Sequence, residues 1–212
     1  MYLSQVEIDI QNRQKIRDLS HLGAFHHWVE QSFPDEIGQA PRTRKLWRID
    51  KLKGRHYLLV VSPARPDLTL LEKYGVSGSA RTKPYDPFLN ALEEGVRARF
   101  RVTLNPVISV KEAAGERGRT KPHVTLEHQM KFLLNRDKKN GFSLNADEFT
   151  VVERSFEPLK RADEKTIQLS KVTYEGVLTI IDKDQFISTL TQGFGKKKAY
   201  GFGMMTVIPE KP

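Results

Sequence analysis

The sequence predicts an α+β protein with antiparallel sheets, and two observations support this prediction. Short runs of alternating apolar and polar residues are typical of half-buried strands, and between them apolar residues recur at helical spacing. These elements follow one another as strand–helix–strand–strand–helix–strand, and the order occurs twice along the 212 residues. It is the order of the split βαβ unit of ferredoxin-like, or RRM-like, domains. We therefore expect two tandem ferredoxin-like (βαββαβ) domains, with the boundaries 1–88 for the first, 89–97 for a linker and 98–212 for the second.

The first half of the chain begins with a strand over residues 2–10, whose apolar residues share one face. Apolar residues at helical spacing then predict a helix from about residue 15 to residue 33, which Pro34 ends. Two strands, a short helical segment and a loop that could contain an edge strand follow at 45–50, 56–62, 66–74 and 75–88.

The second half repeats this order. Its first strand is followed by a polar, basic, glycine-containing insertion at 111–122. A helix is expected where Leu126, Met130, Leu133 and Leu134 give an apolar stripe. The remaining elements are a strand, a longer strand with a kink near Gly176, a helix and a closing strand, at 149–156, 166–181, 184–192 and 202–208.

Composition limits the possible partners. The formal charge is +9, which favours an acidic partner such as nucleic acid or an anionic surface. The absence of cysteine excludes disulfides, thiol nucleophiles and Cys-type zinc sites. The N-terminal stretch lacks the pattern of a signal peptide, and the longest apolar run, residues 57–61, is too short to cross a bilayer. We expect a soluble, cytoplasmic protein with a nucleic-acid partner and no membrane association.

A glycine-rich stretch near the end of the chain, GFGKKKAYGFG at 193–203, contains three consecutive lysines. Adjacent ammonium groups repel one another, so a bound polyanion would neutralise them. Glycine allows a ligand to approach the backbone closely. The stretch is therefore interpreted as a phosphate-facing loop, with a solvated hairpin tip as the alternative. It matches neither GxGxxG nor GxxxxGK.

Six histidines are the groups that titrate near neutral pH, and none has metal-ligand spacing on a helix. No metal site and no cofactor are expected. On a helical wheel His26 lies at the flank of the apolar stripe, whereas His27 points into solvent. A flank position suits a general base with one ring nitrogen free, but a boundary histidine capped by a carbonyl is the alternative. A lone base with many cations fits RNA cleavage, in which the base deprotonates a ribose 2′-OH that attacks the adjacent phosphorus.

Several stretches, taken in order, resemble one family. MYLSQVEID opens the chain, RDL precedes the histidine-bearing helix, LWRID and RFRVTLNPV follow, and YEGVLTIID precedes the final GFGKKKAYGFGMMTV. The chain resembles, over its whole length, the CasE-type CRISPR-associated endoribonucleases of the RAMP superfamily, which are the repeat-processing subunits of type I-E Cascade. The resemblance implies two tandem ferredoxin-like domains and metal-independent cleavage of CRISPR precursor RNA at the 3′ base of the repeat stem-loop. It also implies a 2′,3′-cyclic phosphate product and retention of the mature guide RNA together with other Cascade subunits.

The resemblance also implies which residues act. Counted from the RDL motif at 17–19, the family's catalytic histidine falls on His26, with His27 as the alternative if the register shifts by one. Some members carry a tyrosine three residues before that histidine, where this chain has Gly23. The identity of the group that protonates the leaving oxygen is therefore open, with a lysine of the second domain or His21 as candidates.

A basic hairpin of the second domain enters the RNA stem in this family, and the matching stretch is 154–171. The expected RNA-binding residues are three at its tip, two arginines on the polar face of a strand and the glycine–lysine loop: Lys160, Arg161, Lys165, Arg99, Arg101, Gly193, Gly195, Lys196, Lys197 and Lys198. The alternatives are a solvated loop and ordinary exposed strand residues. The insertion at 111–121 could order on RNA or on a Cascade neighbour. Two other functions stay open, a non-catalytic RNA-binding subunit of a CRISPR ribonucleoprotein and an unrelated binder of double-stranded nucleic acid.

Overall fold

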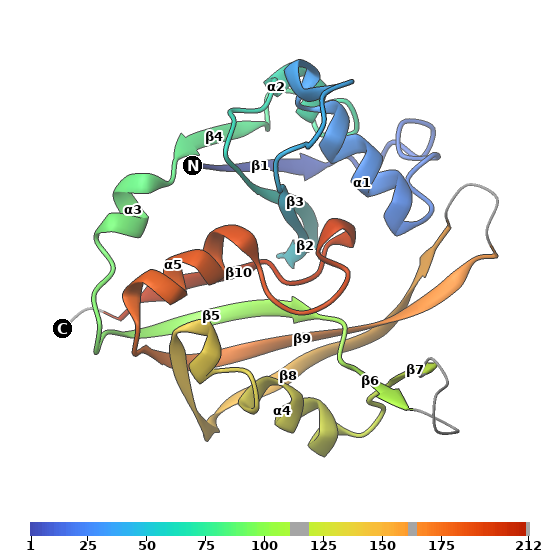
Figure 1. Cartoon of the computed structure of the whole chain (residues 1–212). Helices are drawn as coiled ribbons and strands as arrows, with labels where there is room; N and C mark the ends of the chain where they lie inside the picture. The colour runs from blue at the N-terminus through green and yellow to red at the C-terminus, as the bar shows by residue number, and fades with distance from the viewer. Residues whose placement is uncertain (111–118, 161–164, 211–212) are drawn as a thin grey trace.

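The computed structural model describes residues 1–110, 119–160 and 165–210 and contains two four-stranded antiparallel sheets (Figure 1). The strand order is β2-β3-β1-β4 in the first sheet and β10-β5-β9-β8 in the second. Both orders are those of a ferredoxin-like domain, because each central pair joins the first and third strands of its unit. The predicted fold class is confirmed. A separate two-stranded ribbon, β6-β7, follows β5.

The first sheet and its helices comprise β1 (Tyr2–Ile8), α1 (Leu22–Gln31), η1 (Pro34–Glu36), β2 (Leu46–Leu52), β3 (Arg55–Ser62), α2 (Leu68–Leu71) and β4 (Arg81–Pro84). The helix α3 (Asp86–Asn90) follows β4 in the chain and precedes the second unit. The second unit comprises β5 (Arg97–Leu104), β6 (Val107–Val110), β7 (Arg119–Pro122), α4 (Leu126–Leu134), η2 (Lys138–Asn140), β8 (Phe142–Leu159), β9 (Ile167–Ile180), α5 (Lys183–Gln192), η3 (Lys198–Tyr200) and β10 (Met205–Pro209).

The first strand shows why alternation predicted the first sheet. Val6 and Ile8 are buried in a core cluster with Val29 of α1 and Leu71 of α2, whereas Gln5 points to the opposite, open face. β1 pairs with β3 over its full length and with β4 over residues 2–5. The edge strand that the loop at 75–88 could contain is therefore β4, and it covers one side of β1.

The helix predicted from about residue 15 begins only at Leu22, so this boundary was wrong. His21 is its N-cap, and its Nδ1 accepts a hydrogen bond from the backbone N–H of Ala24 at 3.3 Å. Ile16 and Leu19 lie in turns before the helix and still pack against the first core cluster. Apolar spacing alone cannot separate such packed turns from a first helical turn.

The second sheet follows the same alternation. Ala98, Phe100, Val102 and Leu104 of β5 are buried against a core that includes residues of α4 and α5, whereas Arg99 and Arg101 point to the other face. In α4 the expected stripe was partly wrong, because Leu126 in the first turn is 50% exposed and Phe132 is buried instead.

Strands β8 and β9 form a long hairpin that reaches across toward α1 (Figure 1). β8 begins at Phe142, earlier than expected, because its first residues pair with the end of β9 before an irregularity in the register between Leu144 and Phe149. A Cβ at Gly176 would lie 2.3 Å from the carbonyl oxygen of Glu148, so glycine is required where the strands shift. The connection between the strands contains Lys160 and Lys165, as predicted for the hairpin tip, and Arg161 lies outside the described residues.

β2 joins the two units, because its side chains alternate between their cores. Leu46 is buried in the core of the second unit, and Trp47 is buried in the core of the first. Arg48 donates hydrogen bonds to the backbone oxygens of Arg101 and Met204 in the second unit. In the part of the chain that the structure describes, no helix is long and apolar enough to cross a membrane.

Candidate active site

His26 lies on α1 at the edge of the buried face. Leu22, Trp28 and Val29 turn into the first core, and the indole Nε1 of Trp28 donates to the backbone oxygen of Leu71 at 3.1 Å. His26 is half-buried and His27 is exposed, as the helical wheel predicted. The two adjacent histidines therefore differ in exposure, and residue type alone does not predict this difference.

Burial lowers the pKa of His26 below its usual value, because the imidazolium is more costly to desolvate than the neutral ring. The carboxylate of Glu30, one turn further along α1, raises this pKa, and the charge of Lys45 lowers it. Lys45 is itself fully buried, with its Nζ 2.7 Å from Glu36 and 3.4 Å from Glu30. The net effect is a neutral imidazole near pH 7, which is the form that accepts a proton.

Gly23 is enclosed by neighbouring groups. A Cβ there would lie 2.7 Å from the carbonyl oxygen of Lys160 and 2.9 Å from the imidazole of His21. The end of β8 therefore approaches α1 at the position where some relatives carry a tyrosine. In this conformation there is no room for any side chain at residue 23.

The glycine-rich loop connects α5 to β10 and packs against α1 and β2. Trp47 donates a hydrogen bond from Nε1 to the backbone oxygen of Ala199 at 3.0 Å. A Cβ at Gly201 would lie 2.6 Å from the Trp47 ring, and one at Gly203 would lie 2.4 Å from the carbonyl oxygen of Phe194. These glycines are required for close packing of the loop, so it is a folded element rather than a solvated hairpin tip.

The three consecutive lysines of the loop do not point the same way. Lys196 is exposed, and Lys197 has a left-handed backbone with a φ of 64°. Lys198 turns back, so that its Nζ donates to the backbone oxygen of Gly193 at 3.2 Å. Burial, with a smaller contribution from the charge of Arg44, lowers the pKa of Lys198. Lys196 is thus the most exposed of the three lysines.

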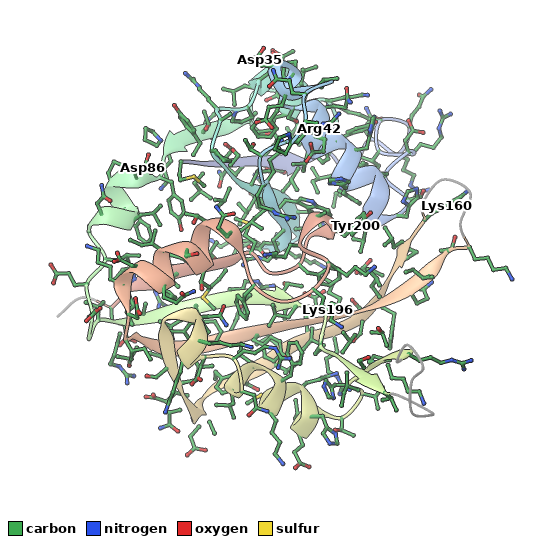
Figure 2. All side chains as sticks on the ribbon, in the orientation of Figure 1. Asp35, Arg42, Asp86, Lys160, Lys196 and Tyr200 are labelled. Atoms are coloured by element: carbon green, nitrogen blue, oxygen red, sulfur yellow. The ribbon has the colours of Figure 1, made fainter. Side chains whose placement is uncertain are left out.

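Tyr200, the last residue of η3, lies next to His26, and the sequence reasoning missed it. The two ring centroids are 5.4 Å apart with an interplanar angle of 66°, an edge-to-face arrangement. Figure 2 shows Tyr200 on the glycine-rich loop and Lys160 at the hairpin end, both close to α1. The available signal was an aromatic residue inside a loop expected to face the histidine.

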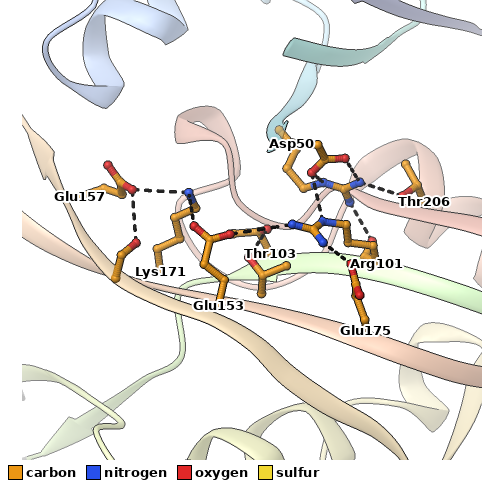
Figure 3. A network of polar contacts seen from close by, with 11 residues as sticks. Asp50, Arg101, Thr103, Glu153, Glu157, Lys171, Glu175 and Thr206 are labelled. Atoms are coloured by element: carbon orange, nitrogen blue, oxygen red, sulfur yellow. Dashed lines mark hydrogen bonds and ion pairs between the residues drawn. The ribbon is translucent and has the colours of Figure 1, made fainter. Parts of the chain in front are cut away.

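Arg101 lines the space between the two sheets, where carboxylates surround it. Its guanidinium pairs with Asp50 at 3.2 Å, with Glu153 at 3.8 Å and with Glu175 (Figure 3). Lys171 continues this network by pairing with Glu153 at 3.3 Å and with Glu157 at 3.4 Å. Because acidic groups already neutralise Arg101, a phosphate would have to displace them.

Arg99 is exposed on the same face and lines an open cleft of about 700 Å³ that also contains acidic residues. Its expected RNA contact stays a prediction. Lys160 and Lys165 are exposed beside the hairpin connection. The described residues hold no cluster of three or more histidine, aspartate and glutamate side chains suited to a metal ion.

The chain belongs to a family described as CRISPR associated protein, because the model of that family matches residues 1–209. It is 28% identical over 220 residues to the CRISPR-associated endoribonuclease Cse3 of Thermus thermophilus, and the match covers 99% of this chain and 100% of the relative. The resemblance to the CasE-type family is confirmed, and the chain is a homologue of a CRISPR-associated endoribonuclease.

Solved structures agree with this relationship. A structure of Cse3 bound to a 19-nucleotide RNA matches with a TM-score of 0.79 and 27% identity, covering 99% of this chain and 100% of the other. Thermus thermophilus Cse3 bound to an RNA that represents a pre-cleavage complex matches with a TM-score of 0.78 and 26% identity, covering 98% of each chain. Cas6e from Escherichia coli shares the fold, with a TM-score of 0.62 and 22% identity, covering 99% of this chain and 100% of the other.

Proposed function

We propose that this protein is a metal-independent endoribonuclease that cleaves CRISPR precursor RNA at the 3′ base of the repeat stem-loop. One observation carries the proposal. The half-buried His26 has a lowered pKa at the point where α1 meets both the glycine-rich loop and the end of the long hairpin. The homology to an endoribonuclease adds support, and the RNA-bound relatives point to the same class of substrate.

In the proposed reaction His26 is the general base. Its neutral imidazole accepts the proton of the ribose 2′-OH, and the 2′-oxygen attacks the adjacent phosphorus. The bond from phosphorus to the 5′-oxygen breaks, and that oxygen takes up a proton, which gives a 2′,3′-cyclic phosphate and a 5′-hydroxyl end. Lys196, which is exposed on the loop, stabilises the negative charge that develops on the phosphorane. The protein supplies orientation and charge, and no redox or metal chemistry is needed for this bond exchange.

The same surfaces are proposed to bind the RNA stem and to retain the product. Lys160 and Lys165 at the hairpin end are exposed and suited to phosphates along one side of a duplex. Because these contacts do not involve the scissile bond, they persist after cleavage and keep the mature guide RNA bound. We propose that the protein acts in the cytoplasm and joins other Cascade subunits through this guide RNA.

Cleavage of the repeat RNA in EDTA tests the proposal. Wild-type protein is expected to cut the all-ribose RNA and to leave a copy with a 2′-deoxy nucleotide at the scissile position intact. His26→Ala should lose cutting and keep binding, while the matched neighbour His27→Ala should keep both. Binding without cleavage of the all-ribose RNA would favour a non-catalytic RNA-binding subunit. Cleavage of the deoxy copy would exclude the 2′-OH mechanism, and loss of cutting in His27→Ala alone would exclude His26 as the base.

A further inference from the structure

The loop that carries Tyr200 is fixed on both sides of this residue. The indole of Trp47 holds the carbonyl of Ala199, and its ring packs against Gly201, which has a φ of 83°. The backbone N–H of Tyr200 donates to the oxygen of Lys197 at 2.9 Å. Since Trp47 is 1% exposed in the first core, the loop has a rigid support on the same unit as α1. These contacts hold Tyr200 next to His26.

Residue 23 of α1 cannot supply a side chain beside His26 in this conformation. Gly23 lies one turn before His26, and the carbonyl of Lys160 occupies the space a side chain at residue 23 would need. Tyr200 itself packs against the first core cluster. The aromatic ring beside His26 thus comes from a loop of the second unit instead of from the helix.

We propose that Tyr200 is a positioning residue for His26, in which the edge-to-face contact of its ring, rather than its hydroxyl, holds the imidazole toward the substrate. The inference rests on the proposed function, in which His26 is the base. Edge-to-face pairs have a preferred geometry, because the positive edge of one ring meets the negative face of the other. A base must be held within a narrow range of orientations, and a misplacement of about 1 Å can lower a rate roughly 100-fold.

The ring also shields the imidazole from water. Burial is the main reason that the pKa of His26 is lowered, so truncation of Tyr200 should allow this pKa to rise toward its usual value. The charged and titratable groups that act on the imidazole remain in the truncated variant, and they are Glu30, Lys45, His27 and Arg42.

Three variants of the full chain test the proposal: Tyr200→Ala, the conservative Tyr200→Phe and the matched control Tyr74→Ala. Tyr74 packs edge-to-face on Trp28 of the same helix, with 5.2 Å between centroids and an angle of 76°. The measurements are the single-turnover cleavage rate with prebound repeat RNA, the RNA dissociation constant, and the NMR resonances and titration of His26 without RNA.

Tyr200→Ala should cleave about 10- to 100-fold more slowly with RNA affinity within about threefold of wild type. Its His26 resonances should move and titrate at higher pH. Tyr200→Phe should restore the rate and the resonances, and Tyr74→Ala should change neither. The proposal is overturned if Tyr200→Phe is as slow as Tyr200→Ala, since the hydroxyl would then be the active group. It is also overturned if Tyr200→Ala leaves the His26 resonances unchanged. That NMR result needs no cleavage, so it is distinguishable from a failure of the proposed nuclease function.

Discussion

Arg48 connects the two units, so substituting it tests how much this connection stabilises the fold. Its guanidinium is 1% exposed and donates five hydrogen bonds from β2. Two reach the carboxylate of Asp50 at 2.7 Å each, and one reaches the hydroxyl of Thr206 at 2.8 Å. The remaining two reach the backbone oxygens of Arg101 at 2.7 Å and Met204 at 2.9 Å. All acceptors except Asp50 belong to the second unit.

The substitution Arg48→Met keeps an aliphatic chain in the same space and removes all five donors. Asp50 retains its pairing with Arg101, which limits the loss. Breaking one side of a buried ion pair costs about 3–5 kcal/mol. The carbonyls of Arg101 and Met204 also lose one donor each, and the packing of the methionine side chain offsets part of this loss. We expect the free energy of unfolding to fall by about 3–5 kcal/mol at neutral pH, a large share of the roughly 5–15 kcal/mol typical of a domain.

The loss of unfolding free energy in Arg48→Met should be smaller at low pH than at neutral pH. Burial alone would raise the pKa of Asp50, but the hydrogen bonds and charge of Arg48, with those of Arg101, outweigh it and lower this pKa. A carboxylate with a lowered folded pKa contributes stability above its unfolded pKa of about 3.9, and the contribution is lost as pH falls through the folded value. The difference between wild type and Arg48→Met should therefore narrow below about pH 4.

Urea unfolding at pH 7 and pH 3.5, followed by tryptophan fluorescence, measures both effects. Arg97→Met is the matched control, because Arg97 lies on β5, is 47% exposed and pairs with Glu148 and Glu210. Exposed pairs contribute about 0–1 kcal/mol, so this control should change little. The reasoning fails if Arg48→Met loses no more stability than Arg97→Met, or if its loss is the same at both pH values.

Three further predictions concern the site. Gly23→Ala should lower the free energy of unfolding by about 1–3 kcal/mol in thermal or urea unfolding, because its Cβ would clash with the Lys160 carbonyl; a stabilised variant would contradict this. Because the pKa of His26 is lowered, kcat/KM for the repeat RNA should rise with pH through a midpoint below about 6.5 and then stay level; a midpoint above that value would refute the assignment. Lys196→Ala should weaken RNA binding and reduce the slope of log affinity against log salt by about 0.7–1, without changing Tm. Lys198→Met should instead lower Tm, because Lys198 bonds to the Gly193 carbonyl. Equal effects of the two variants on binding and on Tm would refute the difference in orientation of the two lysines.

Local patterns were sufficient for the order of the main elements and for the different exposure of His26 and His27. Strand alternation and helical angle depend on the backbone repeat alone, so both can be read without tertiary information. The position of the hairpin tip was implied by the family resemblance, and the structure places Lys160 and Lys165 between β8 and β9. The beginning of α1 was not predictable, because His21 takes the N-cap position that Ser, Thr, Asp or Asn usually takes.

The contacts within the site depend on long-range packing, which local sequence patterns do not show. Tyr200 lies beside His26 on a loop that Trp47, from a third segment of the chain, helps to hold in place. Arg101 was correctly expected on the open face of its strand, but the carboxylates that neutralise it come from other strands. Sequence alternation gives the face of a residue and not the charges opposite it, so a basic strand residue alone is weak support for RNA contact.

The three lysines of the glycine-rich loop illustrate this limit. Their mutual repulsion suggested that all three bind one polyanion. In the folded loop, the backbone conformation and a hydrogen bond separate their charges without a ligand. The left-handed backbone at Lys197 turns the chain, and Lys198 places its ammonium group against the carbonyl of Gly193 just after α5. A basic side chain near a helix C-terminus satisfies carbonyls that no longer have a partner in the helix, so this lysine has a role in the fold without RNA. The lysine run therefore combines phosphate binding, proposed for Lys196, with a support for the loop that carries Tyr200 to His26.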